Sequence, residues 1–191
     1  MRHLYIIAGP NGAGKTTLSY TILPEIFECE DFVNADEIAK GLSPFNPDKA
    51  AMKAGRLMLE RISELLENGQ SFAFETTLST RSYVKLVEQA KTKGYEVILL
   101  FLALESADLA IERVEIRVSE GGHNIPTETI KRRYEMGLKN LFELYIPIVD
   151  KWMLVDNSSD NFEFVAEGTS TELIIRSEEK WSSFDRDNYG N

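Results

Sequence analysis

The chain has 191 residues, of which 43% are hydrophobic and 27% charged, a composition that suits one compact folded domain and excludes wholesale disorder. Its net charge of −10 argues against binding to nucleic acid or to an anionic membrane, and its single cysteine, Cys29, excludes an internal disulfide framework. The longest apolar run, residues 97–104, is too short to span a bilayer, and the amino terminus does not resemble a signal peptide. We therefore expect a cytoplasmic protein with no nucleic-acid or membrane partner.

Apolar periodicity predicts strands that alternate with helices along the chain. Strands are expected at residues 3–8, 31–35, 71–74, 95–104 and 152–155, and helices at 15–26, 47–69, 80–93, 106–121 and 126–146. Residues 162–166 and 172–176 predict a hairpin, and a short helix is expected at 177–187. This alternation predicts an α/β fold with a mostly parallel sheet, and such sheets bind ligands at the carboxyl ends of their strands.

A phosphate-loop motif follows the first predicted strand, because residues 9–16 fit G-x-x-x-x-G-K-[ST] without a mismatch. Its glycines let backbone N–H groups face a phosphate, and the next helix directs its positive end to the same point. Lys15 is expected to reach the β and γ phosphates, and Thr16 to bind Mg²⁺. A similar octet occurs in ABC transporter ATPases, but the L-S-G-G-Q signature of that family is not in this sequence. We expect a three-layer P-loop NTPase that binds ATP through Gly9, Pro10, Asn11, Gly12, Ala13, Gly14, Lys15, Thr16 and Thr17.

Asp36 follows the second predicted strand. The carboxyl ends of parallel strands share one edge of the sheet, so we expect Asp36 near the phosphate loop. A carboxylate there can accept the proton of a hydroxyl nucleophile, which makes Asp36 the predicted general base. The alternative is that Asp36 only N-caps a helix beginning at Glu37.

Glu75 stands at the end of the third predicted strand, directly after residues 71–74, and Thr76 and Thr77 follow it. A carboxylate at this position can hold the hydration shell of Mg²⁺ or bind a substrate hydroxyl. The alternative is an ordinary polar cluster at the end of a strand. Glu105, which follows the strand ending at Leu104, is a rival Mg²⁺ ligand that ranks lower because no threonine pair accompanies it.

An arginine-bearing segment is predicted between residues 106 and 134. Arg113 and Arg117 are four residues apart and share one face of a helix, which Gly121-Gly122 then ends. Such arginines resemble the lid of small kinases, where they neutralise charge that develops during phosphoryl transfer. The alternative is pairing with the four nearby glutamates on a solvated helix face. The second lid residue stays open between Arg117, His123 and Arg132.

Together these motifs resemble the zeta-toxin family of P-loop kinases, in its short "predicted ATPase" branch. The resemblance covers roughly residues 3–157, and its specificity lies in the order of the elements. After the phosphate loop come Asn34-Ala35-Asp36, Glu75-Thr76-Thr77, Lys93-Gly94-Tyr95-Glu96, Glu112-Arg113-Val114 with Arg117, Gly121-Gly122-His123-Asn124-Ile125-Pro126 and Arg132-Arg133-Tyr134.

The resemblance implies a five-stranded parallel core, ATP with Mg²⁺ as phosphoryl donor, and a hydroxyl-bearing small molecule as acceptor. The better-known toxins of the family phosphorylate a sugar hydroxyl of UDP-N-acetylglucosamine, and an antitoxin protein restrains them. Carried over, the resemblance makes Asp36 the base, places Glu75 and Thr77 in the acceptor and metal region, and makes Arg113 a lid arginine. Arg117 is expected to contact ATP.

The chain also departs from the toxin pattern. Glu75-Thr76-Thr77 stands where a typical toxin has Glu-Gly-Thr, and the hairpin from about residue 162 is not part of the pattern. We expect a kinase-like domain at 1–157, with a helical lid at about 106–134, and a hairpin and tail at 158–191 packed on the same domain. The competing functional hypothesis is a nucleotide-dependent interaction module with slow or no ATP hydrolysis.

Overall fold

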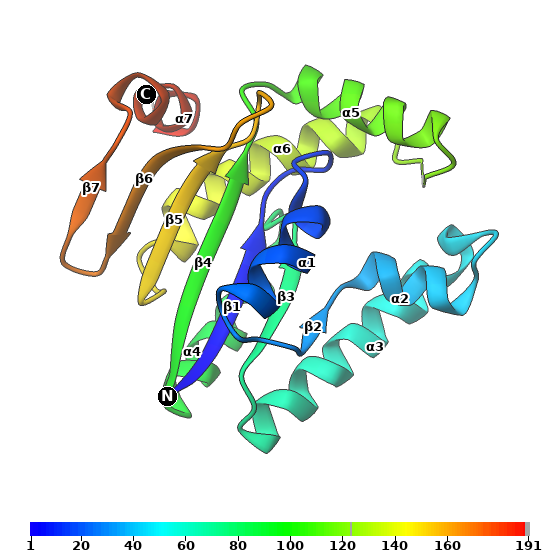
Figure 1. The fold of residues 1–191 in the computed structure, drawn as a ribbon, viewed down its shortest axis with the longest axis horizontal. Coiled ribbons are helices and arrows are strands. Elements are labelled where there is room, and N and C mark those ends of the chain that lie inside the picture. The colour runs from blue at the N-terminus through cyan, green and yellow to red at the C-terminus, as the bar shows by residue number, and fades with distance from the viewer. Residues whose placement is uncertain (123, 190–191) are drawn as a thin grey trace.

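The computed structural model describes residues 1–122 and 124–189, the last four of these by backbone alone. The described chain forms one seven-stranded sheet in the order β2-β3-β1-β4-β5-β6-β7, with α1 in front of the sheet and α4 and α6 behind it in Figure 1. Neighbouring strands from β2 to β5 run parallel. The strands are β1 (Arg2–Ala8), β2 (Phe32–Val33), β3 (Phe72–Thr76), β4 (Tyr95–Ala103), β5 (Lys151–Asp156), β6 (Glu163–Thr169) and β7 (Leu173–Ile175).

The helices follow the predicted alternation, with two departures. The second predicted strand shortens to β2 because Asn34 caps an additional helix, α2, through its side-chain oxygen. The long helix predicted at 126–146 divides into an α-helix and a π-helical turn, η1. The helices are α1 (Lys15–Glu25), α2 (Ala35–Leu42), α3 (Pro47–Asn68), α4 (Val84–Thr92), α5 (Ala107–Ser119), α6 (Thr127–Asn140), η1 (Leu141–Tyr145) and α7 (Glu178–Tyr189).

The core lies on both faces of β1 and β4, the two central strands. Phe101 of β4 and Ile6 of β1 are fully buried, as expected for parallel strands covered by helices on both sides. The helix α3 contributes a stripe that includes Ala54, Met58 and Ile62, and it ends at Gly69, whose φ of 67° few other residues adopt. The predicted α/β fold, a mostly parallel sheet with helices on both faces, is confirmed.

The predicted five-stranded sheet is wrong in one respect, because the C-terminal hairpin enlarges it to seven strands. The strand β6 pairs antiparallel with β5, and β7 pairs antiparallel with β6. The helix α7 then packs against the same edge. Trp181 stacks on Trp152 of β5 with ring centroids 5.8 Å apart, and Phe184 is buried.

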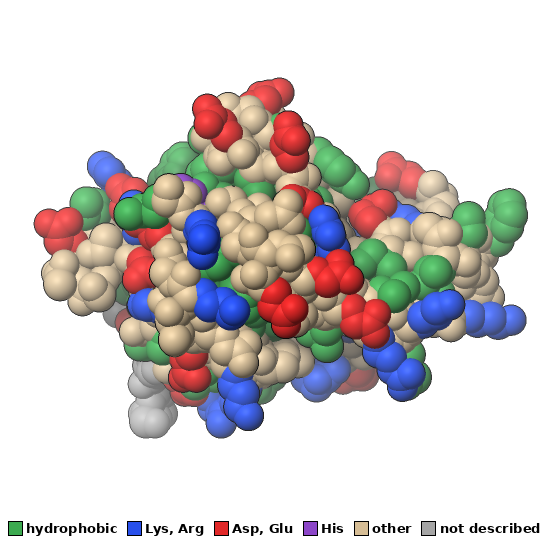
Figure 2. Space-filling model, turned by 90° about the horizontal axis from the view of Figure 1, so that it is seen from below, with side chains coloured by type: hydrophobic (Ala, Val, Ile, Leu, Met, Phe, Trp, Pro, Cys, Tyr) green, Lys and Arg blue, Asp and Glu red, His purple; other side chains and the backbone are tan. Residues whose placement is uncertain are grey.

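The surface carries mixed charge. On the face that Figure 2 shows, the Lys and Arg side chains of the described residues are scattered among acidic ones. None of the helices in the described part of the chain is both long and apolar enough to cross a bilayer.

Phe101→Ala should lower the free energy of unfolding by about 3–5 kcal/mol, because it empties a fully buried ring site at the centre of the sheet. Phe45→Ala is the matched control, since Phe45 is fully exposed at the α2–α3 turn and its removal should change stability by less than about 0.5 kcal/mol. Urea denaturation measures both values. Equal stability losses for the two variants would contradict the assignment of the core.

Candidate active site

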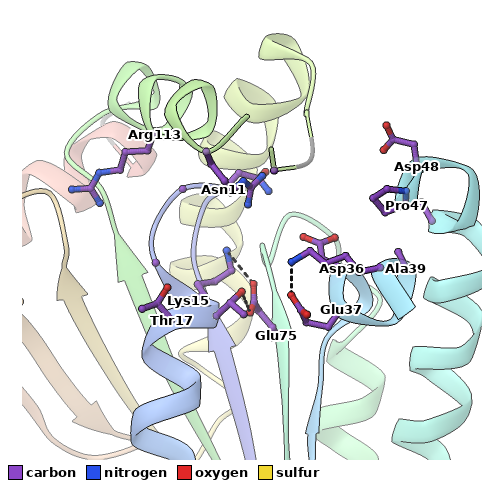
Figure 3. A pocket seen from close by; sticks show the side chains of 17 residues that line it. Asn11, Lys15, Thr17, Asp36, Glu37, Ala39, Pro47, Asp48, Glu75 and Arg113 are labelled. Carbon is purple, nitrogen blue, oxygen red and sulfur yellow. Dashed lines mark hydrogen bonds and ion pairs between the residues drawn. The ribbon is translucent and has the colours of Figure 1, made fainter. Parts of the chain in front are cut away.

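A cavity of about 410 Å³ opens between the phosphate loop and the helices α2 and α3. Its volume lies in the range of about 300–1,000 Å³ that is typical of small-molecule sites. Figure 3 shows side chains from both walls pointing into it. The lining includes these predicted site residues: Asn11, Gly12, Gly14, Lys15, Thr16, Thr17, Asp36, Glu75, Arg113 and Arg117. Gly9, Pro10 and Ala13 belong to the same loop but do not line the cavity, and the further lining residues include Glu37, Lys40, Pro47 and Asp48.

The phosphate loop needs glycine for steric reasons. Gly9 has a φ of 141°, and a Cβ atom there would lie 2.2 Å from the carbonyl oxygen of Leu102. Gly14, with a φ of 81°, is the N-cap of α1 and has no side chain to cap it. The loop therefore passes close to β4 and delivers the N-terminus of α1 to the cavity, where the helix favours an anion.

Lys15 is buried at the base of the cavity. Its Nζ donates a hydrogen bond of 2.9 Å to the carbonyl oxygen of Pro10 and lies 3.7 Å from Oε1 of Glu75. Burial lowers the pKa of Lys15, and the negative charges of Glu75 and Asp36 oppose that effect in part. A buried ammonium group facing a cavity is well placed to bind an anionic phosphate.

Thr16, Asn34 and Glu75 form a hydrogen-bonded cluster beside Lys15. The Thr16 hydroxyl donates to Oε2 of Glu75 at 2.7 Å, and Nδ2 of Asn34 donates to the same oxygen at 2.8 Å. Hydroxyl and carboxylate oxygens are ligands that suit Mg²⁺, which keeps several waters and also binds nucleotide phosphates. In the described residues no group of three or more His, Cys, Asp or Glu side chains could enclose a metal. The cluster therefore fits an ion that ATP and water would also coordinate.

Asp36 lies on the opposite wall, in the first turn of α2. The cap of that helix is Asn34, whose Oδ1 accepts from the backbone N–H of Asp36 at 2.8 Å, so the alternative that Asp36 caps the helix is wrong. Within the described residues, no hydrogen bond or ion pair holds the Asp36 carboxylate. Figure 3 shows it facing the cavity across from Lys15 and Asn11. This carboxylate is available to a ligand.

Two residues that the sequence suggested as acceptor-binding or Mg²⁺-binding residues, Thr77 and Glu105, lie outside the cavity lining. Thr77 does not line the cavity, and its hydroxyl pairs with that of Ser79 at 2.9 Å. The strand β3 ends at Thr76, and the chain turns away there, so the predicted contact of Thr77 with an acceptor needs a rearrangement. Glu105 is exposed and also lies outside the cavity lining.

The arginines differ from one another in where their guanidinium groups lie. Arg113 donates to the carbonyl oxygens of Asn157 and Ser158 at 2.7 and 2.9 Å, and Figure 3 shows its side chain directed away from the cavity. Arg117 lines the cavity, whereas Arg132 is exposed. His123, the other proposed lid residue, lies outside the described residues.

Arg133 contacts the phosphate loop although it does not line the cavity, and the sequence reasoning named it only as part of a motif and considered its neighbour Arg132 for the lid. Arg133 donates to Oδ1 of Asn11 in the phosphate loop at 3.3 Å, and the charge of Asp36 acts on it. Burial lowers the pKa of Arg133, although an arginine remains charged. Helical spacing could have indicated that Arg133 faces inward. Ile130 lies three residues before Arg133 and Gly137 four residues after it, so all three share one face of α6, and both neighbours are buried.

The chain matches known proteins in sequence. The family model described as Zeta toxin matches residues 2–164. The chain belongs to the zeta-toxin family. The recognised resemblance to this family is thus confirmed. An uncharacterised protein of Haemophilus influenzae is 30% identical over 126 residues, which cover 66% of this chain and 88% of that protein.

Two groups of solved structures share the fold. A chain of the AvrRxo1-ORF1:AvrRxo1-ORF2 crystal structure with sulphate ions gives a TM-score of 0.80 at 16% identity, over 99% of this chain and 65% of that one. A structure of that complex with ATP gives a TM-score of 0.78 at 16% identity, with the same coverage. The PezAT toxin–antitoxin system of Streptococcus pneumoniae gives 0.71 at 19% identity, over 100% of this chain and 80% of that one. This chain thus spans 65% of the longer AvrRxo1 protein.

ATP should bind this family member less tightly as the pH is raised from about 7 to about 10. Burial lowers the pKa of Lys15 from its ordinary value of 10.5, and only the protonated amine attracts the phosphates. Binding should therefore be accompanied by proton uptake in the alkaline range. Titration calorimetry in two buffers of different ionisation enthalpy measures affinity and proton uptake together.

Lys15→Ala is the control for this titration. It should bind ATP at least about tenfold more weakly at neutral pH and should lose the alkaline proton uptake. Unchanged affinity in Lys15→Ala would contradict the assignment of Lys15 to the phosphates.

Proposed function

We propose that the protein transfers the γ-phosphate of ATP–Mg²⁺ to a hydroxyl group of a small molecule held between the phosphate loop and α2. The observation that carries this proposal is the Asp36 carboxylate, which faces the cavity opposite buried Lys15 without a hydrogen-bond partner among the described residues. An interaction module that only binds nucleotide has no need of a carboxylate at that position. A kinase needs one there to receive the proton of the acceptor.

Each side chain has a separate part in the proposed reaction. The loop N–H groups, Lys15 and the start of α1 bind the phosphates, and the Thr16 hydroxyl and the Glu75 carboxylate would hold Mg²⁺, directly or through its water molecules. Mg²⁺, when bound, neutralises charge on the β- and γ-phosphate oxygens. Asp36 takes the proton of the acceptor hydroxyl while the oxygen of that hydroxyl forms a bond to the γ-phosphorus. The bond between the γ-phosphorus and the oxygen that leaves with ADP breaks at the same time. Arg133 donates hydrogen bonds to the phosphoryl group as negative charge spreads over the oxygens of that group.

The proposed acceptor is a nucleotide sugar such as UDP-N-acetylglucosamine. The zeta-toxin family supports this choice, and the cavity is large enough for the sugar end of such a molecule. We also propose that a protein antitoxin restrains the enzyme, on the analogy of the PezAT toxin–antitoxin structure. In this proposal residues 1–157 are the catalytic unit, with a lid at about 106–134, and residues 158–191 pack on the same domain.

Asp36→Asn should lower phosphoryl transfer by about a hundred- to ten-thousand-fold, because an amide cannot accept the proton. ATP affinity should change little, and the melting temperature should fall only slightly, since Asn34 remains the cap of α2. Transfer is measured with γ-labelled ATP and UDP-N-acetylglucosamine, and in parallel with a metabolite extract whose labelled product is identified.

Asp108→Asn is the matched control for Asp36→Asn. Asp108 also lies in the first turn of a helix, α5, but it does not line the cavity. Its variant should retain wild-type transfer. Full transfer activity in Asp36→Asn would remove the catalytic assignment. If the label passes only to acceptors other than the nucleotide sugar, the assignment as a kinase stands and the proposed acceptor is wrong.

Arg133→Ala should lower kcat by about tenfold or more while changing the dissociation constant of ATP less, because its contact strengthens as charge develops. Arg113→Ala provides the comparison, since its guanidinium is held by the carbonyl oxygens of Asn157 and Ser158. A loss of kcat in Arg113→Ala with normal kcat in Arg133→Ala would reverse the assignment. That result would show that Arg113 moves into the cavity during turnover.

A further inference from the structure

The last residue of β5 and the two residues that follow it, 156–158, here called the 156–158 loop, contact three parts of the molecule that are far apart in the sequence. The Nδ2 of Asn157 donates to the carbonyl oxygen of Ala13 in the phosphate loop at 2.9 Å. The carbonyl oxygens of Asn157 and Ser158 hold Arg113 of α5. At its base, Oδ2 of Asp156 accepts a hydrogen bond of 2.5 Å from Nζ of Lys180 in α7.

Asp156 makes this arrangement sensitive to α7. Its carboxylate is only 3% exposed, and a buried carboxylate requires partners that offset its charge. Ser158 supplies its backbone N–H at 3.0 Å and its hydroxyl to Oδ1. Lys180 supplies the only opposite charge in contact with Asp156 among the described residues. Without Lys180, the buried carboxylate keeps only the hydrogen bonds from Ser158, and the loop has to shift to bring it into contact with water.

Asn157 transmits that movement to the phosphate loop. A Cβ atom added at Gly14 would lie 2.9 Å from Nδ2 of Asn157, so the amide packs directly behind the glycine that starts α1. The peptide groups of the loop must hold their orientation if their N–H groups are to face a phosphate. The residues matched by the family model end at 164, so Lys180 lies beyond them.

We propose that Asn157 and Lys180 are positioning residues for the nucleotide site: Lys180 fixes Asp156, and Asn157 then holds the phosphate loop from behind. The proposal rests on the ATP-binding part of the proposed function. It assigns the C-terminal helix α7 a part in ATP binding, although α7 does not line the cavity. The same loop anchors Arg113, so in this proposal α7 also sets the position of α5 beside the phosphate loop.

Lys180→Met should weaken ATP binding by about tenfold, and Lys180→Arg should restore most of it because the charge is kept. Arg176→Met is the matched control. Arg176 pairs with Glu167 at 2.5 Å across the β6–β7 hairpin, and among the described residues no hydrogen bond or ion pair joins its side chain to residues 156–158. Its variant should bind ATP as the wild type does. Affinity is measured with a fluorescent ATP analogue, and the melting temperature of each variant is recorded beside it.

A double-mutant cycle separates positioning from a general loss of stability. Asn157→Ala should also weaken ATP binding by about tenfold, and combining it with Lys180→Met should add little, because both act through the same contact. Additive losses of affinity, or wild-type affinity in Asn157→Ala, would overturn the proposal. Asn157→Ala keeps the test decisive if Lys180→Met fails to fold. If the wild type itself does not bind the analogue, the proposed function fails and this inference fails with it.

Discussion

The candidate site depends on one buried positive charge, the ammonium group of Lys15. Burial of an amine is unfavourable, and the protein offsets it with the carbonyl oxygen of Pro10 and the carboxylate of Glu75. Glu75 in turn accepts hydrogen bonds from Thr16 and Asn34, so the charge on the loop orders residues from β3 and from the start of α2. A phosphate that reaches Lys15 therefore enters a site whose oxygen and nitrogen atoms are already oriented.

Local motifs made much of this fold and site predictable from the sequence. The phosphate loop is contiguous in the sequence, so residues 9–16 could be recognised without any tertiary information. The structure adds the reason for the glycine at position 9, where a Cβ atom would lie 2.2 Å from the carbonyl oxygen of Leu102. The parallel core followed from apolar runs that are buried on both faces. Asp36 could be placed near the loop because strand ends share one edge of a parallel sheet.

Long-range contacts were beyond sequence reasoning. The sequence offered three consecutive basic residues at 131–133, and only packing decides that Arg133 turns toward Asn11 while Arg132 is exposed. Arg113 was predicted as a lid residue from its spacing, but the carbonyl oxygens that hold it belong to residues more than 40 positions away. The pairing of Lys180 with Asp156 is equally invisible, because a single lysine on an amphipathic helix does not indicate a buried partner.

The most direct test of the account is a crystal structure with a non-hydrolysable ATP analogue and Mn²⁺, which anomalous scattering locates in place of Mg²⁺. The account predicts that Nζ of Lys15 leaves the carbonyl oxygen of Pro10 for the β and γ phosphates, and that Mn²⁺ binds the Thr16 hydroxyl beside Glu75. It also predicts that the γ-phosphate faces Asp36 across the cavity. An analogue bound elsewhere, or phosphates in the loop with Asp36 turned away from them, would contradict it.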